Sequence, residues 1–220
     1  MAEGEVELPK SPFPRGSEEF DRVLAFSDGL FAIAMTLLVV SLAVPTLQDT
    51  SDVGELADAL DDLIPNFVSF FISFAVIGRY WAAHHQFFAR LRAVDYGLIA
   101  INLVYLCFVA FLPFPTALLG EYFDNPLSIA LYAVAVALVS GLEVVEFRHA
   151  HRHELLGRPM PEDVYRYGVL LSLSPVFFFL LSIPLAFVST SLAVAFWFVG
   201  VPAQLIYNRW KPENADEYLR

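Results

Sequence analysis

The feature that most constrains this chain is a series of long apolar runs. Six stretches with few charges are bounded by polar or proline-containing turns: 24–44, 65–88, 96–119, 126–145, 164–188 and 191–207. An α-helix needs about 20 apolar residues to cross the roughly 30 Å hydrocarbon core of a bilayer. Because 57% of the residues are hydrophobic, too little polar sequence remains to cover such helices in water. The sequence therefore predicts an all-α membrane protein with six transmembrane helices.

The basic residues fall on one side of this six-span map. Of the 13 Lys and Arg, 11 lie before the first span, between the second and third, between the fourth and fifth, or after the sixth, which are all on the same side of the membrane. The other two, Arg79 and Arg166, are expected at span ends on that side. The opposite loops contain only acidic charges: Asp49, Asp52, Glu55, Asp58, Asp61, Asp62, Glu121 and Asp124. The positive-inside rule predicts that both chain ends are cytoplasmic, in a multi-pass protein of the cell membrane with an acidic outer rim.

The segments outside the apolar runs are too short and polar to predict a further folded domain. We expect a disordered cytoplasmic segment at 1–19, one six-helix transmembrane domain at 20–210 and a cytoplasmic tail at 211–220. The first span lacks the short apolar region and cleavage site of a signal peptide, so we expect it to remain in the protein. The single cysteine, Cys107, excludes an internal disulfide. A net charge of −11 argues against nucleic-acid binding and favours cations outside.

The first span begins with polar residues. Arg22 is followed, after three residues, by Phe26, Ser27, Asp28 and Gly29, and the helix beyond is almost entirely apolar. Charged groups are costly inside a membrane, so by default such a segment marks a functional site or a buried polar network.

This segment resembles the first span of the transmembrane-protein-175 potassium channels, in which an Arg and three further residues precede Phe-Ser-Asp-Gly. The resemblance extends to Trp81, His84 and His85 at the end of the second span, to Asn102, and to Phe-Leu-Pro-Phe-Pro-Thr at 111–116. Two prolines in that run predict a break in the third helix. The resemblance covers the first half of the chain by motif and the second half by hydropathy alone. It implies a six-span subunit, a homotetramer and a pore lined by the first span.

One face of the first span is nearly apolar. At about 100° per residue, Ile33, Thr36, Leu37 and Val40 fall near one side of the helix. Counted from the Asp of the motif, the resemblance assigns the constriction to Ile33, Leu37 and Val40, the last being smaller than the expected Leu. Four copies around an axis would stack these side chains as rings that close by dewetting, with a ring of Thr36 hydroxyls. The alternative is that the stripe faces lipid or another helix, as most such stripes do.

The other motif residues are expected to form a structural polar network: Arg22, Phe26, Ser27, Asp28, Gly29, Trp81, His84, His85 and Asn102. We expect Asp28 to pair with Arg22, and with His84 or His85, rather than to coordinate ions. Asp28→Ala should then disturb assembly more readily than selectivity. Adjacent histidines point about 100° apart on a helix, which is poor geometry for joint metal binding and leaves a pH-sensing role open. Trp81 could equally be an interface anchor.

A second group of histidines follows the fourth span. His149, His151 and His153, with Glu143 and Glu146 one to two turns earlier, superficially resemble a metal site. On a helix, His149 and His153 share a face, whereas His151 does not. We expect a solvated, titrating connection here, with no metal site and no cofactor apart from permeant potassium ions.

These observations favour a homotetrameric, moderately selective potassium channel with a hydrophobic constriction, and not an enzyme. The sequence lacks both the Thr-Val-Gly-Tyr-Gly filter and an Arg-rich voltage sensor, so selectivity over sodium should be modest. The alternatives are a secondary transporter and a proton-conducting channel. Pro175, Pro184 and Pro202 are expected to break the later spans, as in transporters, but no ionisable group is expected at midplane depth. An enzyme would need a nucleophile with a base, and Cys107 has no such partner in sequence.

Overall fold

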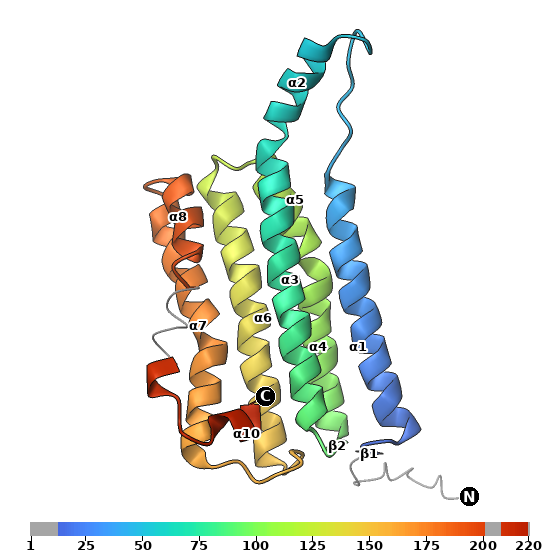
Figure 1. Cartoon of the computed structure of the whole chain (residues 1–220), viewed down its shortest axis with the longest axis vertical. Helices are drawn as coiled ribbons and strands as arrows, with labels where there is room; N and C mark the ends of the chain where they lie inside the picture. Colours follow the sequence, from blue (N-terminus) through green and yellow to red (C-terminus); the bar gives the residue numbers. More distant parts are fainter. Residues whose placement is uncertain (1–12, 201–207, 220) are drawn as a thin grey trace, which may run out of the picture.

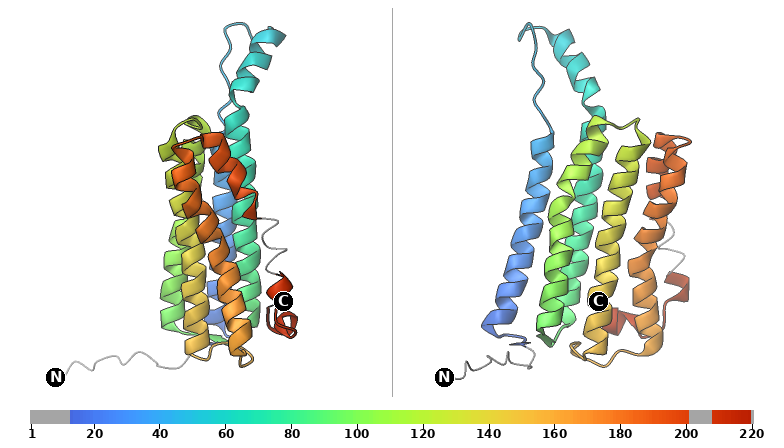
Figure 2. Two further views of the ribbon diagram at one scale, coloured as in Figure 1. Left: turned by 90° about the vertical axis from the view of Figure 1, so that its left-hand side faces the viewer. Right: turned by 180° about the vertical axis from the view of Figure 1, so that it is seen from behind.

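The computed structural model describes residues 13–200 and 208–219. Within them, five helical segments are long and apolar enough to cross a membrane: Glu18–Ser41, Ile64–Arg90, Tyr96–Glu121, Pro126–Arg152 and Glu162–Ala186. They lie side by side in an elongated bundle (Figures 1 and 2). Helix α1 (Glu18–Leu37) forms one edge and α7 (Glu162–Ala186) the other, with α3 (Ile64–Arg90), α4 (Tyr96–Phe111) and α6 (Pro126–Arg152) between them.

The expected sixth span, 191–207, is covered only in part by the described residues. Helix α8 (Thr190–Trp197) packs against α7 and α6, and residues 201–207 lie outside the described part of the chain. The count of six spans and the cytoplasmic position of both ends therefore stay predictions.

The segments at the two ends of the chain carry short elements. Within the expected segment 1–19, β1 (Phe13–Pro14) pairs antiparallel with β2 (Ala93–Val94), and residues 1–12 lie outside the described residues. The carboxyl-terminal part contains η2 (Asn208–Trp210) and α10 (Ala215–Leu219), and α10 contacts α7. The division into tail, transmembrane domain and tail remains a prediction.

Polar side chains at the helix starts explain where several helices begin. Ser17 accepts a hydrogen bond from the backbone N–H of Phe20, Asp95 from that of Leu98, and Asn125 from that of Leu127. Each oxygen satisfies one of the N–H groups that have no partner within the helix. These caps fix the first residues of α1, α4 and α6.

Prolines act differently in the third span and in α7. The third span is interrupted as expected, since α4 ends at Phe111 and α5 (Pro113–Glu121) starts after one intervening residue. The expectation that Pro175 and Pro184 break the later spans is wrong for the described residues, because α7 continues through both. Neighbouring helices can compensate a proline inside a membrane helix. Pro202 lies outside the described residues.

The core lies where α1, α3, α4 and α6 meet, with tyrosines among its largest fully buried side chains. A chain of hydroxyls crosses it: Thr116 donates to Ser73 (2.8 Å), and Ser73 donates to Tyr132 (3.0 Å). Beyond one end of the bundle, α2 (Val53–Asp62) projects away from the other helices and buries no residue (Figure 1).

Candidate functional site

The rotation of α1 about its own axis decides which side chains it presents outward. Ser27, Phe31 and Ala34 of α1 are buried, as is Leu38 of the following 3-10 helix η1 (Leu38–Ser41). At about 100° per residue these four positions fall within about 60° of one another. The residues assigned to the constriction lie about 90° to 150° from the middle of this buried face. They are exposed in the single chain: Ile33 is 59%, Leu37 46% and Val40 74% exposed.

A buried hydrogen-bond network fixes this rotation. The side-chain amide of Asn102 on α4 donates to the Ser27 hydroxyl of α1 (3.0 Å), and His84 Nε2 of α3 donates to the Asn102 carbonyl oxygen (2.9 Å). All three side chains are buried, and the His84 ring stacks on Phe88 with centroids 4.4 Å apart. Since the network joins three helices, α1 cannot turn without breaking it.

Asp28 has a different partner from the expected one. The indole N–H of Trp81 donates to Asp28 Oδ1 at 2.9 Å, and the His85 ring lies against Trp81 with centroids 5.7 Å apart. In the described part of the chain Asp28 forms no ion pair with Arg22, because six residues place the two side chains about 120° apart around the helix.

The motif residues thus form two separate groups. Ser27, His84 and Asn102 meet in the interior, whereas Asp28, Trp81 and His85 meet nearer the surface. The remaining motif residues are exposed: Arg22, Phe26 and Gly29.

The apolar face of α1 continues into the 3-10 helix η1, whose backbone geometry differs from that of α1. The Thr36 hydroxyl donates to the carbonyl of Ile33 (2.9 Å), so its proton is used within the helix, while the residue is exposed and the oxygen can still accept a hydrogen bond. The helix then tightens into η1, where side chains three residues apart eclipse each other. Val40 therefore lies approximately over Leu37 and extends the same apolar face.

Ionisable groups from different helices form a second candidate site, and the sequence did not indicate that Arg79 lies beside Glu143 and Glu146. A cavity of about 180 Å³ between α3, α6 and α7 is lined by Arg79, Glu143 and Glu146, among others. Glu146 is 2% exposed, and within the described residues one oxygen of each of the two carboxyl groups has no hydrogen-bond partner. Arg79, expected at a span end, lies near the middle of α3 because this helix continues to Arg90.

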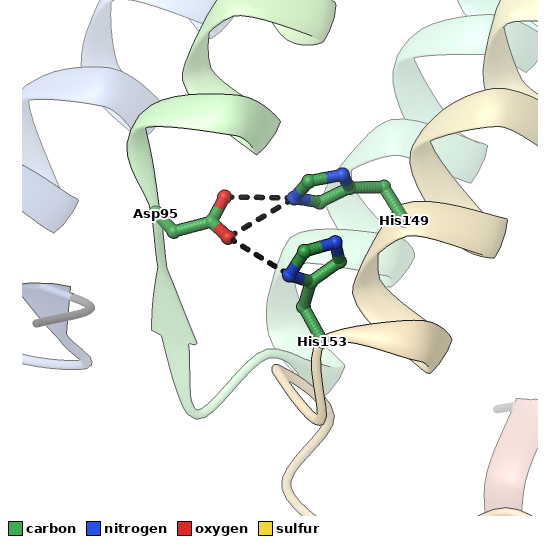
Figure 3. Close-up of side chains that lie close together, drawn as sticks. All are labelled: Asp95, His149 and His153. Carbon is green, nitrogen blue, oxygen red and sulfur yellow. Dashed lines mark hydrogen bonds and ion pairs between the residues drawn. The ribbon is translucent and has the colours of Figure 1, made fainter. Parts of the chain in front are cut away.

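Three ionisable side chains also meet at the end of the bundle where α1 begins (Figure 3). His149 Nε2 donates to both carboxylate oxygens of Asp95 (2.9 and 3.0 Å), and His153 Nδ1 lies 3.8 Å from Asp95 Oδ2. His151, in contrast, stacks on Tyr165. The geometry agrees with the expected shared face of His149 and His153, but the sequence did not indicate Asp95, which lies 54 residues before His149.

The environment of Asp95 favours its charged form. Burial raises the pKa of the Asp95 carboxyl, but the backbone N–H of Leu98 and the nearby rings of His149 and His153 stabilise the carboxylate. Their combined effect outweighs burial and lowers the pKa below its ordinary value.

Comparison with known proteins gives consistent sequence matches. Residues 22–113 match the family described as endosomal/lysosomal potassium channel TMEM175. A potassium channel of Chamaesiphon minutus is 35% identical over 195 residues, which cover 82% of this chain and 91% of that protein. A potassium channel of Streptomyces collinus is 41% identical over 55% of this chain and 57% of its own length. The human endosomal/lysosomal proton channel TMEM175 is 39% identical over 42% of this chain and 19% of its own length.

Solved structures match over nearly the whole chain. The crystal structure of a lysosomal potassium-selective channel TMEM175 homologue from Chamaesiphon minutus is similar with a TM-score of 0.69 at 33% identity, covering 87% of this chain and all of that one. A crystal structure of the potassium channel MtTMEM175 gives a TM-score of 0.58 at 20% identity, covering 92% of this chain and 97% of that one. The second match shows similarity of fold alone.

Proposed function

Because this chain belongs to the TMEM175 family of ion channels, we propose that it forms a homotetrameric potassium channel in the cell membrane, with α1 of each copy lining the pore. Family membership and the apolar helices support a multi-pass membrane protein that acts as a cation channel. The relatives from Chamaesiphon minutus and Streptomyces collinus are named potassium channels, which supports potassium as the permeant ion.

The exposed apolar face of α1 is the observation that carries this proposal. The network of Ser27, Asn102 and His84 holds the opposite face of α1 against α3 and α4. Ile33, Leu37 and Val40 are then free to meet their counterparts from other copies. Closed rotational symmetry would turn each of these positions into a ring of side chains around one axis.

Such rings define the expected conduction properties. Branched apolar side chains form a constriction that closes by dewetting, and they offer no ligands to replace the hydration shell of an ion. We therefore expect potassium to be favoured over sodium only moderately. The Thr36 oxygen adds a weak acceptor between the Ile33 and Leu37 rings.

The proposal is tested by ion flux from vesicles that contain the purified protein, with a potassium gradient as the only driving force. Leu37→Asn should raise conductance or weaken selectivity, because a polar side chain wets the constriction. Leu181→Asn is the matched control: Leu181 is exposed to a similar extent (56% against 46%) but lies on α7, at the far edge of the bundle. Flux that requires a second, coupled ion would point to a transporter instead. Equal currents in wild type and Leu37→Asn would remove Leu37 from the pathway.

Proton conduction is the second candidate function. It is favoured by the cavity lined by Arg79, Glu143 and Glu146, and by the name of the human relative. Opposed gradients of potassium and pH separate the two candidates. A reversal potential that follows the potassium gradient supports the first proposal, and one that follows the pH gradient supports the second.

A further inference from the structure

We propose that Asp95, His149 and His153 bind a divalent transition-metal ion, best matched by Zn²⁺, which links the start of α4 to the end of α6. This goes beyond ion conduction, because the cluster lies away from the exposed face of α1 and its test measures binding, not flux.

The positions of the donor atoms support a shared ion. Each residue offers one ligand atom, and the three atoms lie within 4.8 Å of one another. Zinc binds nitrogen and oxygen ligands at about 2.0–2.2 Å, so ligand atoms of a tetrahedral site are roughly 3.3 Å apart. The distances to one carboxylate oxygen, Asp95 Oδ2, are 3.0 Å from His149 Nε2 and 3.8 Å from His153 Nδ1, and they lie on either side of that value. If the two imidazole nitrogens and this oxygen closed to that spacing, they would complete three corners of the tetrahedron.

The chemistry of these ligands selects the class of metal. Two imidazoles and one carboxylate suit zinc and its transition-metal neighbours, whereas calcium and magnesium prefer sites made only of oxygen ligands. Three protein ligands leave the fourth corner to water. To bind the metal through Nε2, the neutral His149 ring would release its Nε2 proton to water and take one from water at Nδ1. The bond from Nε2 to the metal would then replace the hydrogen bond to Asp95.

The surrounding backbone is shaped for the close approach of His149. A Cβ atom at position 97 would lie 2.6 Å from His149 Cε1 and 3.0 Å from Nε2, so glycine at this position leaves room for the ring. The rings of His149 and His153 are stacked with centroids 4.1 Å apart, which aligns them on one side of α6. Both residues lie at the carboxyl end of α6, where the helix dipole favours a positive charge.

Calorimetric titration of zinc chloride into the purified full-length protein in mild detergent tests the site. We expect about one ion per chain in wild type, and an affinity weaker by more than about tenfold in His153→Ala. The His153 side chain is 56% exposed, so this variant should fold. His151→Ala is the matched control, because this residue comes from the same helix but stacks on Tyr165 instead. Equal zinc affinity in wild type and His153→Ala, or an equal loss in His151→Ala, would overturn the proposal.

A second measurement examines the geometry directly. The visible absorption of Co²⁺ distinguishes tetrahedral from octahedral coordination and does not depend on channel activity. We expect the tetrahedral spectrum in wild type and its loss in Gly97→Ala, whose methyl group would displace His149. Asp95→Asn should also lose the spectrum while keeping an oxygen to cap α4. A wild-type spectrum in both variants would contradict the assigned ligands.

Discussion

Asn102 is the residue on which the orientation of α1 depends most directly. It donates to Ser27 on one helix and accepts from His84 on another, so Asn102→Ala removes both hydrogen bonds and strands two buried polar groups. Hydrogen bonds between membrane helices contribute up to about 1.7 kcal/mol each. We expect the free energy of unfolding to fall by about 1–3 kcal/mol, measured as a lower melting temperature in detergent.

Gln86→Ala is the control for the loss of stability expected in Asn102→Ala. Gln86 is also an amide, but it is exposed, and the one side-chain hydrogen bond described for it is a long one (3.5 Å) from Arg90. Surface substitutions of this kind usually change stability by less than about 0.5 kcal/mol. If both variants melted at the same temperature, the network would not hold α1.

For the polar motif residues of α1, α3 and α4, the sequence predicts the members of the network but not their partners. The set of network residues could be proposed from their polar character inside apolar helices and from the family resemblance. Their partners could not, because hydrogen bonding depends on the relative rotation of α1, α3 and α4. Trp81 was expected to be a network member or an interface anchor, and it donates to Asp28. Arg22, the expected partner of Asp28, lies on another side of the same helix.

At the scale of elements, α1 departs from a simple helical projection. Its apolar positions were placed by assuming about 100° per residue throughout, yet the last turn is a 3-10 helix. In such a turn Val40 follows the direction of Leu37 more closely than a regular helix allows. Val40, although smaller than the Leu expected from the resemblance, therefore extends the apolar face beyond Leu37.

We expect the structure of the segment before α2 to depend on pH. The Glu55 carboxylate accepts hydrogen bonds from the backbone N–H groups of Gln48 (2.7 Å) and Asp49 (3.0 Å), and these bonds lower the pKa of Glu55. Because the folded protein lowers the pKa of Glu55, these hydrogen bonds stabilise the fold fully at a pH above the ordinary pKa of a glutamate. The stabilisation is lost as the pH falls through the lowered pKa. We expect hydrogen exchange to show loss of protection at the Gln48 and Asp49 amides over that acidic range.

Glu55→Gln and Asp61→Asn allow this effect to be assigned. Glu55→Gln should remove most of the pH dependence of hydrogen-exchange protection at the Gln48 and Asp49 amides. The measurement is the ratio of the exchange rate in the variant to that in wild type at each pH. Asp61 lies on the same exposed helix α2, but the Gln48 and Asp49 amides donate to Glu55 and not to Asp61, so Asp61→Asn should behave as wild type. An unchanged pH profile in Glu55→Gln would show that other groups hold the segment.

At the scale of the whole molecule, the bundle was largely predictable and the clusters between helices were not. Length and hydropathy located five spans that agree with the long helices, because a bilayer sets the length of any apolar helix. The Asp95 cluster and the Arg79 cavity each combine residues from different helices. Their sequence separation hides them, since apolar periodicity carries no information about which helices become neighbours.

The final prediction concerns assembly, because a single copy of this chain cannot enclose a pore with one helix. If α1 lines a fourfold axis, native mass spectrometry in mild detergent should give the mass of four chains. Ile33→Cys in a Cys107→Ser background should then form disulfides between copies on oxidation, since a narrow ring brings equivalent residues within the roughly 7 Å that a disulfide requires. Leu181→Cys in the same background should not, because α7 lies at the opposite edge from α1. A monomeric mass, or cross-linking through position 181 but not through 33, would place α1 outside the conduction pathway.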